Sequence, residues 1–113
     1  MNNVFQRIIG LLVVTMISLV FATLTHAASF DCSKAATNVE KIVCGDTALS
    51  QLDDDLNVAY KAALQKNEKQ AVAIRQSQKQ WIKTRNDCQD STCLTQSYQQ
   101  RIYRTASSSR AET

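Results

Sequence analysis

Four cysteines in a chain of 113 residues constrain the fold more than any other feature of this sequence. They are Cys32, Cys44, Cys88 and Cys93. A domain this small buries too little apolar surface to be stable by burial alone, and an even number of cysteines in a short exported chain is typical of a disulfide framework. We therefore expect two disulfides, for which three pairings are possible.

One pairing is favoured by where the cysteines lie in the chain. Cys32 precedes a short predicted helix and Cys44 ends it, so a bridge between them would clamp that helix to the segment before it. Four residues separate Cys88 from Cys93, a spacing that can bring the two Cα atoms within the ~4.4–6.8 Å that a disulfide needs. We expect these two bridges, whereas the rival pairings would join the N-terminal segment to the last helical hairpin.

A zinc site is the alternative use of four cysteines. Zinc-binding cysteines typically come in closely spaced pairs, whereas eleven residues separate the first two cysteines here and four separate the last two. The only histidine, His26, lies in a segment that we expect to be removed. We expect neither a metal nor any other cofactor.

The N-terminus has the layout of a secretory signal peptide over residues 1–27. Arg7 is its only charged residue, an apolar run follows, and Ala27 closes a small-residue exit. An uncleaved membrane anchor is the alternative, since about 20 apolar residues span a bilayer. The residues before Cys32 form no lipobox, so after cleavage we expect no membrane or lipid anchor and a location in the periplasm or outside the cell.

Helical periodicity runs through the rest of the chain, which has no proline and one glycine, Gly45. Thr37 and Glu40 match a capping box at the start of the first helix, and Gly45 is expected to end that helix in the left-handed conformation. We predict an all-α domain over residues 28–106, a bundle of three to four helices with two disulfides, followed by a disordered tail at 107–113. The predicted helices cover residues 38–44, 47–66, 68–86 and 93–105.

Charge is nearly balanced but unevenly distributed. Cleavage after Ala27 leaves 86 residues with twelve basic and ten acidic side chains. Residues 28–60 carry a net charge of −4 and residues 61–113 carry +6. Near neutrality and export argue against binding nucleic acid, while an uneven charge distribution can steer partners of either sign.

The residue types for common catalysis are missing. Without histidine outside the leader, and with the cysteines in bridges, nucleophilic catalysis of the Ser-His or Cys-His kind is excluded. Asp53, Asp54 and Asp55 are consecutive, so on a helix they point about 100° apart and cannot face each other as a glycosidase pair. We expect no enzymatic activity.

Residues 30–103 resemble the bacterial LprI-type lysozyme-inhibitor family. The first half of the resemblance consists of Phe30-Asp31-Cys32, Lys34-Ala35, Val39-Glu40-Lys41-Ile42-Val43-Cys44, Leu49, Leu52-Asp53, Leu56 and Tyr60. The second half consists of Gln78, Trp81, Arg85, Cys88, Cys93, Tyr98, Arg101 and Ile102. The resemblance implies a small exported helical domain and, for function, inhibition of lysozyme. The family's namesake is lipid-anchored, whereas this chain lacks a lipobox, so we expect no lipid anchor here.

Six of these residues are candidates for either a structural or a binding role: Asp53, Tyr60, Gln78, Trp81, Arg85 and Tyr98. Trp81 and Arg85 lie one turn apart on the predicted third helix. In the structural alternative Trp81 is a core residue and Arg85 caps a carbonyl or pairs with a buried Asp53. In the binding alternative they face a partner, because Trp, Tyr and Arg are typical interface anchors.

The resemblance leads to a mechanism and to an alternative. An inhibitor would occlude the lysozyme cleft, with the acidic residues 46–55 attracting a cationic enzyme and a disulfide-closed loop placing a donor between the catalytic carboxylates. The alternative is a non-inhibitory envelope module that binds another envelope protein or, through its basic second half, the cell wall. We expect a monomer in either case.

Overall fold

The computed structural model describes residues 3–4, 7 and 28–110. The expected signal peptide lies almost entirely outside the described residues, as do the last three residues of the expected tail. Within the described ranges, no helix is both long and apolar enough to span a bilayer.

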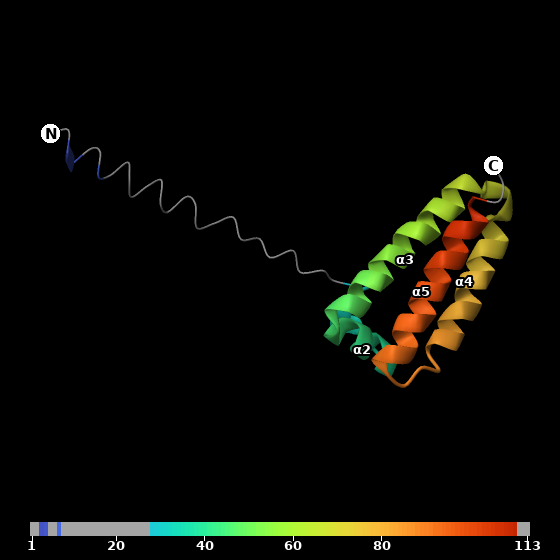
Figure 1. The fold of residues 1–113 in the computed structure, drawn as a ribbon, viewed down its shortest axis with the longest axis horizontal. Helices are drawn as coiled ribbons and strands as arrows, with labels where there is room; N and C mark the ends of the chain where they lie inside the picture. Colours follow the sequence, from blue (N-terminus) through green and yellow to red (C-terminus); the bar gives the residue numbers. More distant parts are fainter. Residues whose placement is uncertain (1–2, 5–6, 8–27, 111–113) are drawn as a thin grey trace.

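The all-α prediction is confirmed. Residues 28–110 contain two short 3₁₀ turns, η1 (Cys32–Lys34) and η2 (Glu68–Gln70), and four α-helices. The α-helices are α2 (Asn38–Gly45), α3 (Thr47–Lys66), α4 (Ala71–Arg85) and α5 (Ser91–Ser108). The three long helices α3, α4 and α5 lie side by side, and the short α2 packs at the end of the bundle where α3 begins (Figure 1). The loop from α4 to α5 lies at that same end (Figure 1).

The start of α2 follows the predicted capping box. The Thr37 hydroxyl accepts a hydrogen bond from the Glu40 backbone N–H at 3.1 Å, and the Glu40 carboxylate accepts from the Thr37 backbone N–H at 3.0 Å. The predicted left-handed glycine at its end is wrong. Gly45 is the last residue of α2 and no glycine in the described residues has a positive φ. The chain turns instead at the extended Asp46, whose carboxylate caps α3 by accepting from Ala48 and Leu49 N–H groups.

The later helix boundaries differ from the prediction by a few residues. Asn67 ends α3 as expected, but residues 68–70 form a 3₁₀ turn before α4 begins. Helix α5 starts two residues early because the Asp90 carboxylate caps it, accepting from the Cys93 N–H at 2.8 Å. It continues to Ser108, so the beginning of the expected tail is helical.

Both expected disulfides are present. The Cα atoms of Cys32 and Cys44 lie 5.8 Å apart, and those of Cys88 and Cys93 lie 5.6 Å apart. No described cysteine is free. The first bridge ties the segment before α2 to its last turn, and the second closes the α4–α5 loop.

The core lies toward the disulfide end of the bundle. Its buried residues come mainly from α2, α3 and α5: Val39, Val43, Leu49, Leu56, Leu94 and Tyr98, joined by Ala28 and Cys88. The most extensive packing is between α3 and α5. Helix α4 contributes only one fully buried residue, Arg85, with Trp81 packed at the edge of the core. The attachment of α4 therefore depends on polar and aromatic contacts.

Candidate functional site

A buried polar cluster joins the three long helices through one hydroxyl group. Asp53 of α3, Arg85 of α4 and Tyr98 of α5 are 6%, 7% and 0% exposed. The Tyr98 hydroxyl donates to Asp53 Oδ1 at 2.8 Å and accepts from Arg85 Nη1 at 2.9 Å. The expected partnership of Asp53 with Arg85 is thus made through the tyrosine.

Aromatic rings surround the Arg85 guanidinium. Its central carbon lies 5.6 Å from the centre of the Trp81 ring and 5.9 Å from that of Tyr98, within the range of cation–π attraction. The two rings pack edge to face with centres 5.1 Å apart, and the Trp81 indole N–H donates to the Ser97 hydroxyl at 3.1 Å. Arg85 Nε and Nη2 also donate to the Asn86 side-chain oxygen.

The second oxygen of Asp53 holds the segment that follows the expected cleavage site. Asp53 Oδ2 accepts from the Ser29 backbone N–H at 2.9 Å and from the Ser29 hydroxyl. Ala28 beside it is 6% exposed and belongs to the core cluster. No buried side-chain nitrogen or oxygen in the described part of the chain lacks a hydrogen-bond partner. Both carboxylate oxygens of Asp53 are therefore engaged within the protein.

The cluster changes the pKa of its tyrosine. Burial raises the pKa of Tyr98 far above its ordinary value, the positive charge of Arg85 opposes this, and the negative charge of Asp53 adds to it. Nearby, the Thr37 and Ala36 backbone N–H groups lower the pKa of Glu40, and Arg85 contributes to the same effect. The Tyr98 hydroxyl therefore remains protonated at neutral pH and can donate to Asp53.

A shallow pocket of about 270 Å³ opens beside the cluster. Five of the six candidate residues line it, and only the fully buried Tyr98 does not. The five are Asp53, Tyr60, Gln78, Trp81 and Arg85. The structure thus brings together residues that lie as far apart in the sequence as Asp53 and Arg85. Gln78 also accepts from Arg101 Nε at 3.0 Å, so its side-chain oxygen is engaged as well.

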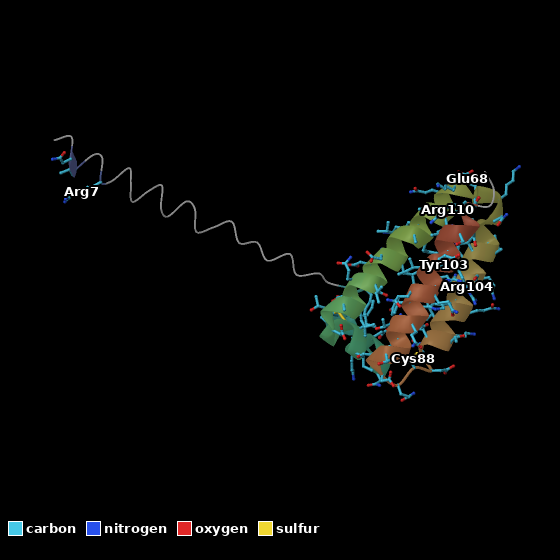
Figure 2. All side chains as sticks on the ribbon, viewed as in Figure 1. Arg7, Glu68, Cys88, Tyr103, Arg104 and Arg110 are labelled. Carbon is cyan, nitrogen blue, oxygen red and sulfur yellow. A yellow bond between two sulfur atoms is a disulfide. The ribbon has the colours of Figure 1, made fainter. Side chains whose placement is uncertain are left out.

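Acidic side chains gather at the end of the bundle that carries both disulfides. Five of the nine acidic residues in the described part of the chain belong to short segments at this end: Asp31, Glu40, Asp46, Asp87 and Asp90. Three more, Asp53, Asp54 and Asp55, lie in the first half of α3, which begins at this end. The ninth, Glu68, lies at the opposite end from Cys88 (Figure 2). The gathering has a local cause, because several helices begin here and their first turns favour acids. Asp46 and Asp90 cap α3 and α5.

The α4–α5 loop also contributes to this acidic end, which the sequence alone does not indicate. Asp87, Gln89 and Asp90 are exposed, as are the hydroxyl residues Ser91 and Thr92 that begin α5. The sequence does place an acid, Asp90, just ahead of a helix, but only the antiparallel topology brings this loop to the end of the bundle where α3 begins.

These features define the chain first as a small disulfide-bonded helical domain whose buried titratable groups, Asp53, Arg85 and Tyr98, connect its three long helices. Residues 32–108 of the chain match the model of one protein family, "Lysozyme inhibitor LprI". The chain belongs to this family, and the resemblance found in the sequence is confirmed. The family is one of inhibitors, which is consistent with the expectation of no enzymatic activity.

Curated relatives support the assignment. The proteins named lipoprotein LprI from Mycobacterium bovis and Mycobacterium tuberculosis are 37% identical to this chain over 86 residues. The match covers 73% of this chain and 43% of each relative, so the chain spans less than half the length of these relatives. No solved structure matches the chain.

Proposed function

We propose that this chain is an exported protein that binds and inhibits lysozyme through the acidic end of its bundle. Membership of the lysozyme-inhibitor family supports the partner at the level of its class. The observation that carries the choice of surface is the segregation of charge along the bundle, with the acids at the disulfide end and a basic excess at the other.

Charge segregation favours this orientation for a cationic enzyme. Complementary charge accelerates encounter and orients the partners more than it adds to final affinity. Asp54 and Asp55 are the acids of α3 that do not belong to the buried cluster, and Asp87 lies in the α4–α5 loop at the same end. Since Asp55 and Asp87 are exposed and Asp54 is half-exposed, these three carboxylates are the steering groups in our proposal.

The loop closed by Cys88 and Cys93 is the segment that we propose enters the enzyme cleft. Lysozyme catalysis uses two carboxyl groups, so an occluding group must donate hydrogen bonds. Ser91 and Thr92 are exposed, and their hydroxyls have no hydrogen-bond partner within the described residues. The disulfide holds the loop in one shape and thereby reduces the entropy lost on binding.

The expected export supports the same role, because an inhibitor must meet its enzyme outside the cytoplasm. The relatives named above are lipoproteins by name. For this chain we propose cleavage after Ala27 and release into the periplasm or the medium. A mass measurement on the exported protein tests this, since its first residue should be Ala28.

A turbidity assay with lysozyme and the purified exported protein tests the proposed function. Thr92→Glu should weaken inhibition by at least about tenfold, because it places a third carboxylate between the two of the cleft. The fold should tolerate it, since an acid in the first helical turn is favourable. Thr92→Gln is the neutral control of equal length and should inhibit nearly as well as the parent.

The steering residues are tested in the same assay at two salt concentrations. Asp54→Asn with Asp55→Asn should slow the onset of inhibition several-fold at low salt and much less at 0.15 M salt, where screening has shortened the range of the attraction to roughly 8 Å. Glu68→Gln, at the opposite end, is the matched control and should have no effect. Absence of inhibition at micromolar protein in both salts would contradict the proposal and favour the non-inhibitory envelope module.

A further inference from the structure

A second pocket, of about 210 Å³, lies between α3, α4 and α5 near the end of the bundle opposite the disulfides. Two guanidinium side chains line it, those of Arg101 and Arg104 on α5. Ser77 of α4 and Asn67 at the end of α3 line the same pocket. The pocket is separate from the acidic end and from the buried Asp53–Tyr98–Arg85 cluster.

Arg101 is held in place at the wall of this pocket by neutral groups. Its Nε donates to Gln78 Oε1 at 3.0 Å and its Nη1 donates to the Ser77 hydroxyl at 2.9 Å. The side chain is half-buried, and its burial and the neighbouring Arg104 both lower the pKa of Arg101. Arginine stays charged in proteins, so the pocket contains two positive charges that repel each other.

No carboxylate in the described part of the chain compensates these charges. Helices α4 and α5 contain no aspartate or glutamate. The one salt bridge found among the described residues joins Lys34 to Asp31 at the other end of the bundle. Glu68 is the only described acid near this end, and it does not line the pocket. The described residues that line the pocket therefore supply donors and positive charge but no carboxylate.

We propose that this pocket binds a phosphoryl group, either free or carried by an envelope lipid or polymer. A phosphate monoester carries about −1.5 to −2 charges at pH 7, which matches two guanidinium groups. Guanidinium groups bind phosphate oxygens in pairs of parallel hydrogen bonds, and Arg101 still has one Nη1 and two Nη2 hydrogens for this. The Ser77 hydroxyl accepts from Arg101 and can donate its own proton to the same anion.

The hydroxyls near the C-terminal end of α5 do not take part in this recognition. Thr105 and Ser108 also line the pocket, but their hydroxyls donate to the carbonyl oxygens of Arg101 and Arg104. Exposed Lys66 and Lys69 at the same end add positive charge around the pocket without lining it. The site is thus built by two arginines, one hydroxyl and the surrounding basic end, and it does not depend on the proposed inhibition of lysozyme.

The site is tested by titrating phosphate into the isotope-labelled exported protein. Amide chemical shifts are measured by NMR, and chloride keeps the ionic strength constant. We expect saturable shifts centred on Ser77, Arg101 and Arg104. Arg104→Gln should weaken binding about tenfold or more, because it removes charge-assisted hydrogen bonds to the anion. The matched control is Arg75→Gln, which removes an exposed arginine of α4 outside the pocket and should bind phosphate as the parent does.

Two further arms identify the source of the phosphoryl group. Vesicles that contain phosphatidic acid, whose headgroup is a phosphate monoester, test a lipid source. Co-sedimentation with these vesicles but not with phosphatidylcholine vesicles, and its loss in Arg104→Gln, would assign the site to a lipid headgroup. Saturable binding of phosphate and glycerol 3-phosphate without vesicle binding assigns it to a soluble or polymer-borne group. Shifts that do not saturate, or equal weakening in Arg75→Gln and Arg104→Gln, would overturn the proposal.

Discussion

At the scale of single residues, Tyr98 is the link on which the polar cluster depends. Among the described residues, its hydroxyl is the only group bonded to both Asp53 and Arg85, and those two residues lie on different helices. A buried charge that loses its hydrogen-bond partner is costly, whereas a fully satisfied network fixes one arrangement of the helices. The phenyl ring alone would preserve the core packing but not this connection.

Tyr98→Phe should therefore destabilise the protein by about 2–3 kcal/mol at pH 7, measured by urea unfolding. The effect should shrink at high pH. Because burial raises the pKa of Tyr98 in the folded state, the stability that this group contributes is present below its unfolded pKa of about 10 and is lost as pH rises beyond that value. Tyr103→Phe, at a side chain 72% exposed, is the control. Equal stability of Tyr98→Phe and the parent at pH 7 would contradict this role.

The candidate residues could be selected from the sequence, but their arrangement could not. Helical spacing places Trp81 and Arg85 on one face of one helix, and both belong to the cluster that the structure shows. The sequence contains no information on the register between α3 and α5, which are 45 residues apart at the Tyr98–Asp53 hydrogen bond. The tyrosine between Asp53 and Arg85 was therefore not predictable, although both charged residues were named.

At the scale of helices, side-chain caps determined the boundaries more than glycine did. The Thr37–Glu40 capping box was readable because both residues stand at a fixed spacing. The predicted start of α5 is two residues late because Asp90, which the polar sequence around it places in a loop, caps the helix instead. At Gly45 the general preference of glycine for a left-handed helix end did not apply, since Asp46 caps α3 from an extended conformation.

The capping box predicts a pH dependence that belongs to α2. The pKa of Glu40 is lowered in the folded state by the backbone N–H groups of Thr37 and Ala36. Its stabilising contribution is therefore present above its ordinary pKa of 4.5 and is lost as pH falls through the lowered folded value. Glu40→Gln should lose this part of the acid dependence in urea unfolding between about pH 5 and pH 3. Glu68→Gln is the control: Glu68 belongs to no capping box, so this variant should keep the acid dependence of the parent. If Glu40→Gln also keeps the acid dependence of the parent, the capping box does not cause it.

At the scale of the whole molecule, helix direction separates the charges. Helices α3 and α5 begin at one end and α4 begins at the other, so capping acids of distant segments meet beside the disulfides. The net charges of the two halves were visible in the sequence, but the fold redistributes them. Asp87 and Asp90 lie in the basic half of the sequence and at the acidic end of the structure. Only the topology reveals where these two acids lie. It also brings Ser77 of α4 within hydrogen-bond distance of Arg101 of α5 at the second pocket.

The two disulfides offer a test in which stability and function should change in opposite order. In the loop-entropy description a bridge stabilises more when it closes a longer loop. The sequence separations of 12 for Cys32–Cys44 and 5 for Cys88–Cys93 correspond to about 3 and about 2 kcal/mol. Replacing Cys32 and Cys44 by serine should therefore lower the urea midpoint more than replacing Cys88 and Cys93.

Inhibition of lysozyme should follow the reverse ranking, because in our proposal only the Cys88–Cys93 loop enters the cleft. Opening that loop restores its freedom in the unbound protein, and each side chain that must then be immobilised on binding costs about 0.5–1.5 kcal/mol. The inhibition constant should rise about tenfold or more in the Cys88→Ser, Cys93→Ser protein and by less in the Cys32→Ser, Cys44→Ser protein, provided both are assayed where they are folded. If inhibition instead tracks stability across the two variants, the loop is a structural clamp and the binding surface lies elsewhere on the acidic end.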